Sequence, residues 1–139
     1  MKIINKIILT IIISITISCD KNDSNGKNND LTDITWILIK YFDERSGMNT
    51  INPEENEYYS IIFKNSGEIS AKDACNDCSG SFDISDDNSV EISGMSCTEM
   101  VCAGLQYFSS FNGDFSFQVN NDTLELTSSG VTKIYYFVQ

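Results

Sequence analysis

The sequence predicts a small, mainly β domain: an antiparallel barrel-like or strongly curled sheet with one short helix. From residue 31 onward, apolar side chains recur with a period of two along most of the chain, which is typical of strands. Turn-forming triplets such as Asn65-Ser66-Gly67 separate these runs. Many short antiparallel strands in one small domain favour a barrel or a strongly curled sheet, because closure removes exposed edges.

The expected strands follow one another with short connections. The first covers residues 34–41 and is apolar on both faces, and a long polar loop over residues 43–57 follows it. A loop of this length in a small domain is either functional or mobile. Further strands are expected over residues 58–64, 68–74, 80–85, 90–92, 115–119, 123–127 and 133–138.

The segment over residues 98–112 breaks the period of two and predicts the one helix. Thr98 is a suitable N-cap, and Glu99 suits the positively polarised helix end. Four apolar residues recur at helical spacing, namely Val101, Leu105, Phe108 and Phe111. Gly113 ends the run.

Residues 1–18 are predicted to be a signal peptide rather than part of the fold. Lys2 and Lys6 precede an apolar stretch over residues 7–17, which is too short to span a membrane. A small residue followed by Cys19 resembles a bacterial lipobox, in which the cysteine is lipidated and becomes the mature N-terminus. The alternative is a plain secretory signal with an incidental cysteine.

Residues 19–30 are predicted to be a lipidated cysteine followed by a flexible polar tether, and residues 31–139 one domain. The acidic, Asn-rich start of the tether resembles lipoproteins of the Bacteroidetes. Without the two lysines of the leader, seven basic residues face 20 acidic ones, a net charge of −13. Such a chain repels anionic headgroups, so the lipid must hold it at the membrane. We expect a lipid-anchored protein of the cell envelope, at the outer membrane on its periplasmic or surface face.

Composition excludes several function classes. A net charge of −11 disfavours a nucleic-acid partner, since phosphate binding needs basic surface. The absence of histidine removes Ser-His-Asp triads, Cys-His nucleophiles and histidine metal ligands. The acidic clusters over residues 54–57 and 83–91 lack a calcium-loop spacing and are interpreted as solvated loops. We therefore predict no catalytic residue, no metal and no cofactor. We also expect a monomer.

Four cysteines fall in the domain: Cys75, Cys78, Cys97 and Cys102. Behind a signal peptide, disulfides are favoured over a zinc site. A strand rather than a helix is expected after Cys78, which argues against a catalytic redox motif. The nested pairing, Cys75–Cys102 with Cys78–Cys97, closes loops of about 18 to 26 residues, each worth roughly 3 kcal/mol. The crossed pairing is the alternative.

Two motifs resemble those of the META/HslJ-like family. Residues 74–82, ACNDCSGSF, resemble its "GCN-x-x-x-G-x-[YF]" signature, and residues 97–102, CTEMVC, resemble its "T-[RK]-M-x-C" signature. The closing strands over residues 122–137 are similar to the family's ending. Ala74 stands where the family has glycine, and Glu99 where it has a basic residue. The resemblance implies a barrel-like sheet with one helix, an envelope location and no established enzymatic activity.

The resemblance also implies structural rather than catalytic roles for the signature residues. The first motif is expected to shape a turn, and the second is expected to dock the helix against the barrel. The residues concerned are Trp36, Asn76, Gly80, Thr98 and Met100.

The sequence thus predicts a non-enzymatic envelope lipoprotein that serves envelope integrity or stress tolerance through contacts with an envelope protein. One alternative is a lipocalin-like carrier, because the many aromatic residues could line a cavity for a small apolar ligand. Another is an inhibitor that presents the acidic loop of residues 43–57 to a cationic enzyme.

Overall fold

The computed structural model describes residues 31–52, 59–85, 88–101 and 104–139. The predicted signal peptide and tether, residues 53–57 of the predicted polar loop and residue 58 of the next predicted strand lie outside these ranges. The described residues form nine strands and no helix. The prediction of a mainly β domain is confirmed, and the expectation of one short helix is wrong.

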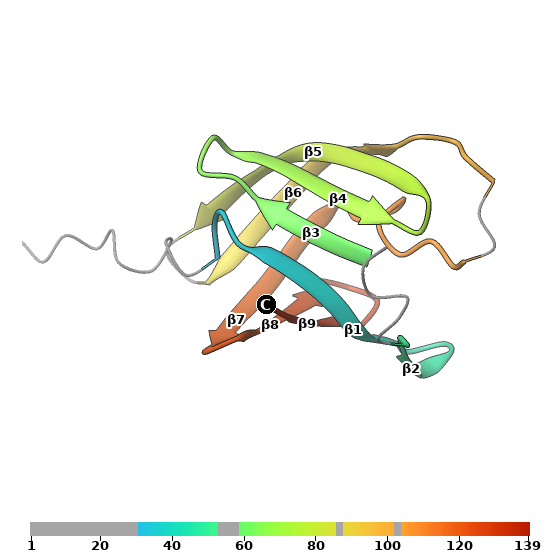
Figure 1. The fold of residues 1–139 in the computed structure, drawn as a ribbon. Helices are drawn as coiled ribbons and strands as arrows, with labels where there is room; N and C mark the ends of the chain where they lie inside the picture. Colours follow the sequence, from blue (N-terminus) through green and yellow to red (C-terminus); the bar gives the residue numbers. More distant parts are fainter. Residues whose placement is uncertain (1–30, 53–58, 86–87, 102–103) are drawn as a thin grey trace, which may run out of the picture.

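Eight of the nine strands form a closed antiparallel barrel (Figure 1). Each strand from β3 to β9 pairs with the next along the chain, and β1 pairs with both β3 and β9, so the sheet closes on itself. Closure removes the sheet edges that the sequence argument invoked. The barrel strands are β1 (Thr35–Asp43), β3 (Tyr59–Phe63), β4 (Glu68–Asp73), β5 (Asn76–Ser85), β6 (Ser89–Cys97), β7 (Gly113–Asn120), β8 (Thr123–Ser128) and β9 (Lys133–Val138).

The remaining strand, β2 (Gly47–Thr50), lies within the loop predicted over residues 43–57. It pairs with the C-terminal half of β1, on the edge where β3 pairs with the N-terminal half. Phe42 lies opposite Met48 in this pair. Four residues that include a glycine give no period-two signal, which explains why sequence reasoning missed the strand.

The barrel interior is filled by large side chains from alternate strand positions. In β3 and β4, buried residues alternate with more exposed ones. The largest fully buried side chains include those of Trp36, Tyr135, Phe63, Phe108, Phe111 and Phe137. Ring pairs such as Phe111–Phe115, with centroids 4.6 Å apart, add about 0.5–1.5 kcal/mol each beyond their burial.

β5 and β6 extend further than the strands predicted over residues 80–85 and 90–92. The register shifts between Ser79 and Ser81, where Gly80 on β5 faces two residues of β6, Gly94 and Met95, which marks a bulge in β6 opposite Gly80. A Cβ atom on Gly80 would lie 2.9 Å from the carbonyl oxygen of Ser93. Gly80 therefore lies in a strand rather than a turn, and it permits the close approach of two backbones.

Residues 98–112 form a loop in their described part, where a helix was predicted. Val101 and Leu105 were expected to face the core, but they are 102% and 66% exposed, respectively. Backbone N–H groups of this segment bond to the side chains of Asp73 and Asn76 instead of to helical carbonyls. Side chains that satisfy the backbone in this way compete directly with helix formation.

Candidate functional site: a loop fastened over one barrel end

The loop of residues 98–112, called here the end loop, connects β6 to β7 at one end of the barrel. Figure 1 shows it at the end opposite to the turns that join β3 to β4 and β5 to β6. The end loop carries the second sequence motif, and the first motif lies at the β4–β5 turn and the start of β5. The fold therefore brings the two motifs together.

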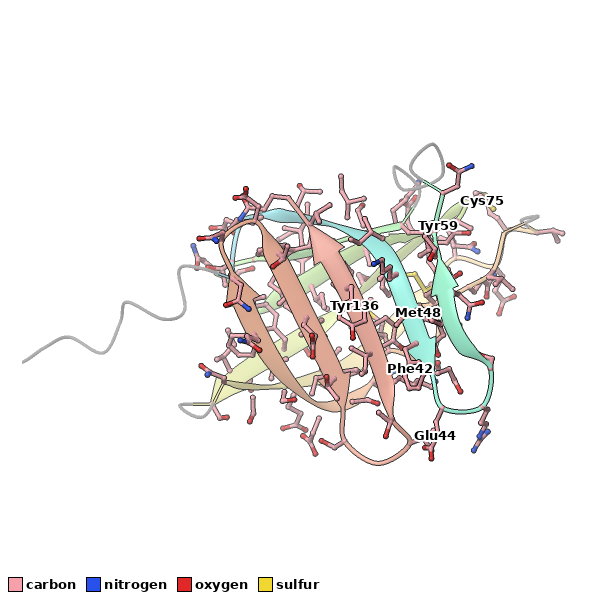
Figure 2. All side chains as sticks on the ribbon, turned by 90° about the horizontal axis from the view of Figure 1, so that it is seen from below. Phe42, Glu44, Met48, Tyr59, Cys75 and Tyr136 are labelled. Atoms are coloured by element: carbon pink, nitrogen blue, oxygen red, sulfur yellow. A yellow bond between two sulfur atoms is a disulfide. The ribbon has the colours of Figure 1, made fainter. Side chains whose placement is uncertain are left out.

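A disulfide between Cys78 and Cys97 joins β5 to β6 where the end loop begins. The two residues are direct partners in the strand register, with Cα atoms 4.0 Å apart. This bond is one half of the predicted nested pairing. Cys75 is also disulfide-bonded, and it lies with Tyr59 at the end-loop side of the barrel (Figure 2). Its predicted partner Cys102 lies outside the described residues, so that half stays a prediction.

The buried amide of Asn76 holds the first part of the end loop. Asn76 is 1% exposed. Its Oδ1 accepts hydrogen bonds from Met100 N at 2.7 Å and from Thr98 Oγ1 at 3.0 Å, and its Nδ2 donates to Met100 O at 3.3 Å. Thr98 also exchanges two bonds with the backbone of Asp77. One side chain thus satisfies both backbone groups of Met100 in a setting where unpaired groups are costly.

The buried carboxyl of Asp73 holds the second part of the end loop. Asp73 is fully buried. Its Oδ1 accepts from Tyr107 N and its Oδ2 from Phe108 N, each at 2.8 Å, and Ser109 N donates as well. Burial raises the pKa of the Asp73 carboxyl, and the three N–H donors partly oppose this shift. Sequence reasoning did not single out Asp73, although a charged residue on the inward face of a predicted strand is a usable signal.

Two phenylalanines anchor the end loop in the barrel. Phe108 and Phe111 are fully buried, with ring centroids 5.4 Å apart. Phe111 also packs edge-on against Tyr135 at 4.9 Å, and Phe108 stacks against Phe137 at 6.3 Å. Burial of two such rings stabilises the closed end by about 1.5–3 kcal/mol each.

Close packing fixes the loop against the β4–β5 turn. A Cβ atom on Gly104 would collide with the Tyr59 hydroxyl and lie 3.3 Å from Ala74 Cβ. Ala74 has a φ of 57°, in the left-handed region. Glycine adopts this conformation without strain, which explains why the motif of the META/HslJ-like family has glycine where this chain has Ala74.

Three large apolar side chains of the end loop face outward, although hydrogen bonds to Asn76 and Asp73 hold the backbone of this loop. Met100 is 52% exposed, Val101 102% and Leu105 66%. The backbone of Met100 is therefore docked as the resemblance implied, while its side chain is not. We call these three side chains the apolar tip. Large apolar side chains exposed close together along one loop are candidates for an interaction site.

Trp36 fastens the start of the domain. Its side chain is fully buried, and Nε1 donates to the carbonyl oxygen of Leu31 at 3.0 Å. The indole therefore ties the first described residue to β1, which gives this signature residue a structural role.

Two tyrosines, Tyr41 and Tyr135, pack together near the end loop, with Tyr135 buried and Tyr41 partly exposed. Tyr41 Oη donates to Asp43 Oδ2 at 2.9 Å, and the Tyr41 ring contacts both Tyr107 and Tyr135. Burial, followed by the hydrogen bond to Asp43 and then the charge of Asp43, raises the pKa of Tyr41 to about 12. Burial also raises the pKa of Tyr135. Both phenols are therefore neutral at physiological pH.

The chemistry available at this site is structural fastening. A carboxylate oxygen of Asp73 and the sulfurs of Cys78 and Cys97 lie within 4.8 Å of one another. Both sulfurs are joined in the disulfide, so neither is a thiolate ligand for a metal ion. Every buried side-chain nitrogen and oxygen in the described ranges has a hydrogen-bond partner. The predictions of no catalytic residue and no metal stay predictions.

Fold and site together define a small antiparallel β-barrel protein in which buried polar side chains fasten a loop over one end. The chain belongs to the META domain family, because the family model "META domain" matches residues 29–139. This membership agrees with the resemblance carried by the two motifs.

Solved structures show the same fold. The chain is similar to a DUF4847 family protein from Bacteroides vulgatus, with a TM-score of 0.57 and 16% identity over 81% of this chain and 96% of that one. It is also similar to a protein from Burkholderia xenovorans, with a TM-score of 0.57 and 13% identity over 78% of this chain and 83% of that one. No curated protein matches the chain. In the part of the chain that the structure describes, no helix is long and apolar enough to cross a bilayer.

Proposed function

We propose that this protein is a non-enzymatic, lipid-anchored protein of the cell envelope that serves envelope integrity or stress tolerance through contacts of its apolar tip with another envelope protein. The observation that carries the proposal is the exposure of Met100, Val101 and Leu105 on a backbone held by buried groups. A pre-ordered loop loses little conformational entropy on binding.

The placement of the tip supports this proposal. In Figure 1 the chain enters β1 at the end of the barrel away from the end loop. A lipid on Cys19 and a tether over residues 20–30 would therefore connect to the domain at the end opposite to the apolar tip. The net charge of the whole chain, −11, disfavours adsorption of the protein itself to anionic lipid.

The packing of the interior disfavours a lipocalin-like carrier. Phe108 and Phe111 close one end, and their rings contact Tyr135 and Phe137 inside. A small apolar ligand would have to displace these fully buried rings, which are packed as in other protein cores. The inhibitor hypothesis rests on the acidic loop of residues 43–57, and residues 53–57 of it fall outside the described residues.

Site-specific photo-cross-linking in cells tests the proposal. A photoreactive residue at position 105 of the full-length protein should give a discrete cross-linked product. The matched control is the same residue at position 131, where Val131 is also exposed, at 43%, in the β8–β9 turn. A product that is lost on Val101→Asp, together with loss of envelope-stress tolerance in that variant, is the expected result. Equal cross-linking from both positions, or none from position 105, contradicts the proposal.

Anchoring is tested separately. Cys19→Ala should move the protein from the membrane fraction to the soluble fraction, because a chain with a net charge of −11 is repelled by anionic lipid once the acyl anchor is lost. Retention of the variant in the membrane fraction would contradict a lipid anchor at Cys19.

A further inference from the structure

A row of five polar and aromatic side chains crosses the outer face of the barrel. The strand register places Gln118 opposite Glu125, Glu125 opposite Tyr136, Tyr136 opposite Lys40, and Lys40 opposite Thr50. The row therefore runs across β7, β8, β9, β1 and β2. In β7, β8 and β9 the residues next to the row are buried, namely Phe117, Leu124, Leu126, Tyr135 and Phe137. Gln118, Glu125 and Tyr136 therefore face outward by the alternation of strand side chains. Lys40 and Thr50 are themselves exposed.

A groove of about 400 Å³ lies over this row. Its lining includes four row residues and, beside them, the apolar side chains of Ile39 and Met48. Met48 is 53% exposed. Figure 2 shows Tyr136 and Met48 on the same face of the barrel, over β9 and β2. The groove thus combines one aromatic ring, an apolar wall and several hydrogen-bonding side chains.

We propose that this groove binds an uncharged oligosaccharide. A sugar ring has an apolar C–H face, which suits the exposed part of an aromatic ring such as that of Tyr136. Its hydroxyl groups both donate and accept, and the row offers the amide of Gln118, the carboxylate of Glu125 and the ammonium of Lys40. A few polar groups around an apolar floor are the usual composition of a small-molecule site.

Charge selects this ligand class. Lys40 forms no ion pair within the described ranges, where the two ion pairs are Lys64–Glu68 and Lys72–Asp77. Glu125 accepts one long hydrogen bond, 3.5 Å, from Thr127. The two opposite charges flank Tyr136 on either side, so the groove itself is electrically balanced. An anionic glycan would be repelled by the negative net charge of the chain, −11.

The arrangement also disfavours a lipid chain in the groove. An acyl chain laid across the row would remove water from Lys40 and Glu125 without replacing their hydrogen bonds. Neighbouring strands lie about 4.8 Å apart, so the four steps of the row span roughly 19 Å along the curved surface. This extent suits a chain of several sugar units rather than a single one. The apolar wall of Ile39 and Met48 suits the methyl of an N-acetyl group.

Titration calorimetry on the full-length protein in detergent tests the proposal. The probes are the tetramer of N-acetylglucosamine, cellotetraose, an anionic tetragalacturonate and decanoate. Saturable binding of one of the two uncharged tetramers is the expected result. Binding of tetragalacturonate or decanoate alone, or of no probe, overturns the proposal.

Variants locate the site. Tyr136→Ala should weaken binding at least tenfold, and Tyr136→Phe should keep most of it because the ring remains. Gln118→Ala, at an exposed position, should weaken binding without affecting folding, so the test does not depend on the stability of the Tyr136 variant. Val131→Ala is the matched control outside the groove and should bind like the wild type. Unchanged binding in both Tyr136→Ala and Gln118→Ala would overturn the assignment. The result is independent of the apolar tip, which lies on other residues.

Discussion

Replacing Asn76 by aspartate should make the stability of the protein depend on pH, because Asn76 attaches the end loop to the barrel. Asn76→Asp keeps the size and shape of the side chain, and it keeps the acceptor that serves Met100 N and Thr98. It replaces the Nδ2 donor, 3.3 Å from Met100 O, by an oxygen. At neutral pH the new carboxylate is charged, and this oxygen can only accept hydrogen bonds although it faces a carbonyl oxygen. The position is 1% exposed in the wild type, so the charge is buried.

The expected loss at pH 7 is about 3 kcal/mol of unfolding free energy, since a buried unsatisfied group costs about 1–3 kcal/mol and a charged one more. Burial and the facing carbonyl should raise the pKa of the new carboxyl in the folded state above its unfolded value. The folded variant then binds a proton more tightly than the unfolded chain does. Its stability relative to the wild type is therefore retained at about pH 4 or below and is lost as pH rises through the folded pKa.

Urea unfolding followed by the fluorescence of Trp36, the one tryptophan of the chain, measures this difference at pH 4 and pH 7. The matched control is Asn120→Asp, the same chemical change at the exposed end of β7, which should alter stability by less than about 0.5 kcal/mol. If Asn76→Asp loses the same small amount at both pH values, the buried amide does not hold the loop as argued.

Three further predictions concern the scaffold. Gly80→Ala should lower the unfolding free energy by about 2 kcal/mol in urea, because its Cβ would lie 2.9 Å from a backbone oxygen; an unchanged midpoint would count against a tight bulge. The double change Cys78→Ser with Cys97→Ser should lose about 3 kcal/mol in thermal melts, and an unshifted Tm would show that the disulfide is dispensable. The pKa of Tyr41 is about 12 in the fold and about 10 when unfolded, so its stabilising contribution is complete below pH 10 and is lost as pH rises through 12. Phenolate absorbance at increasing pH checks this, and ordinary titration of every tyrosine in the folded protein would contradict it.

The β architecture could be predicted because alternation is a local signal. The runs around Ile69 and Phe117 alternate clearly, and turns rich in glycine and asparagine separate the strands. The family motifs also pointed to Asn76 and Thr98. What the motifs did not give is the chemistry: a buried amide that holds both backbone groups of Met100.

The helix prediction failed for a tertiary reason. The spacing of Val101, Leu105 and Phe108 fits a helix, and the one local signal against it is Gly104, a weak helix former. The N–H groups of this segment are instead taken by Asp73, which lies 34 and 35 residues away from its two partners Tyr107 and Phe108. A bond over such a sequence separation leaves no periodic trace in the sequence.

The outer groove could not be predicted either, because it depends on register. Gln118, Glu125 and Tyr136 are unremarkable polar and aromatic residues until strand pairing aligns them. A shift of one residue in any pair would turn its side chains to the other face. The sequence contains the residues of the row but not their alignment.

Amide hydrogen exchange in the end loop tests most directly whether buried side chains fasten a loop with an outward apolar tip. The account predicts slow exchange for the amides of Met100, Tyr107 and Phe108, whose N–H groups bond to Asn76 or Asp73, and fast exchange for those of Val101 and Leu105. Uniform slow exchange across the whole loop, as in a helix, or uniform fast exchange would contradict it.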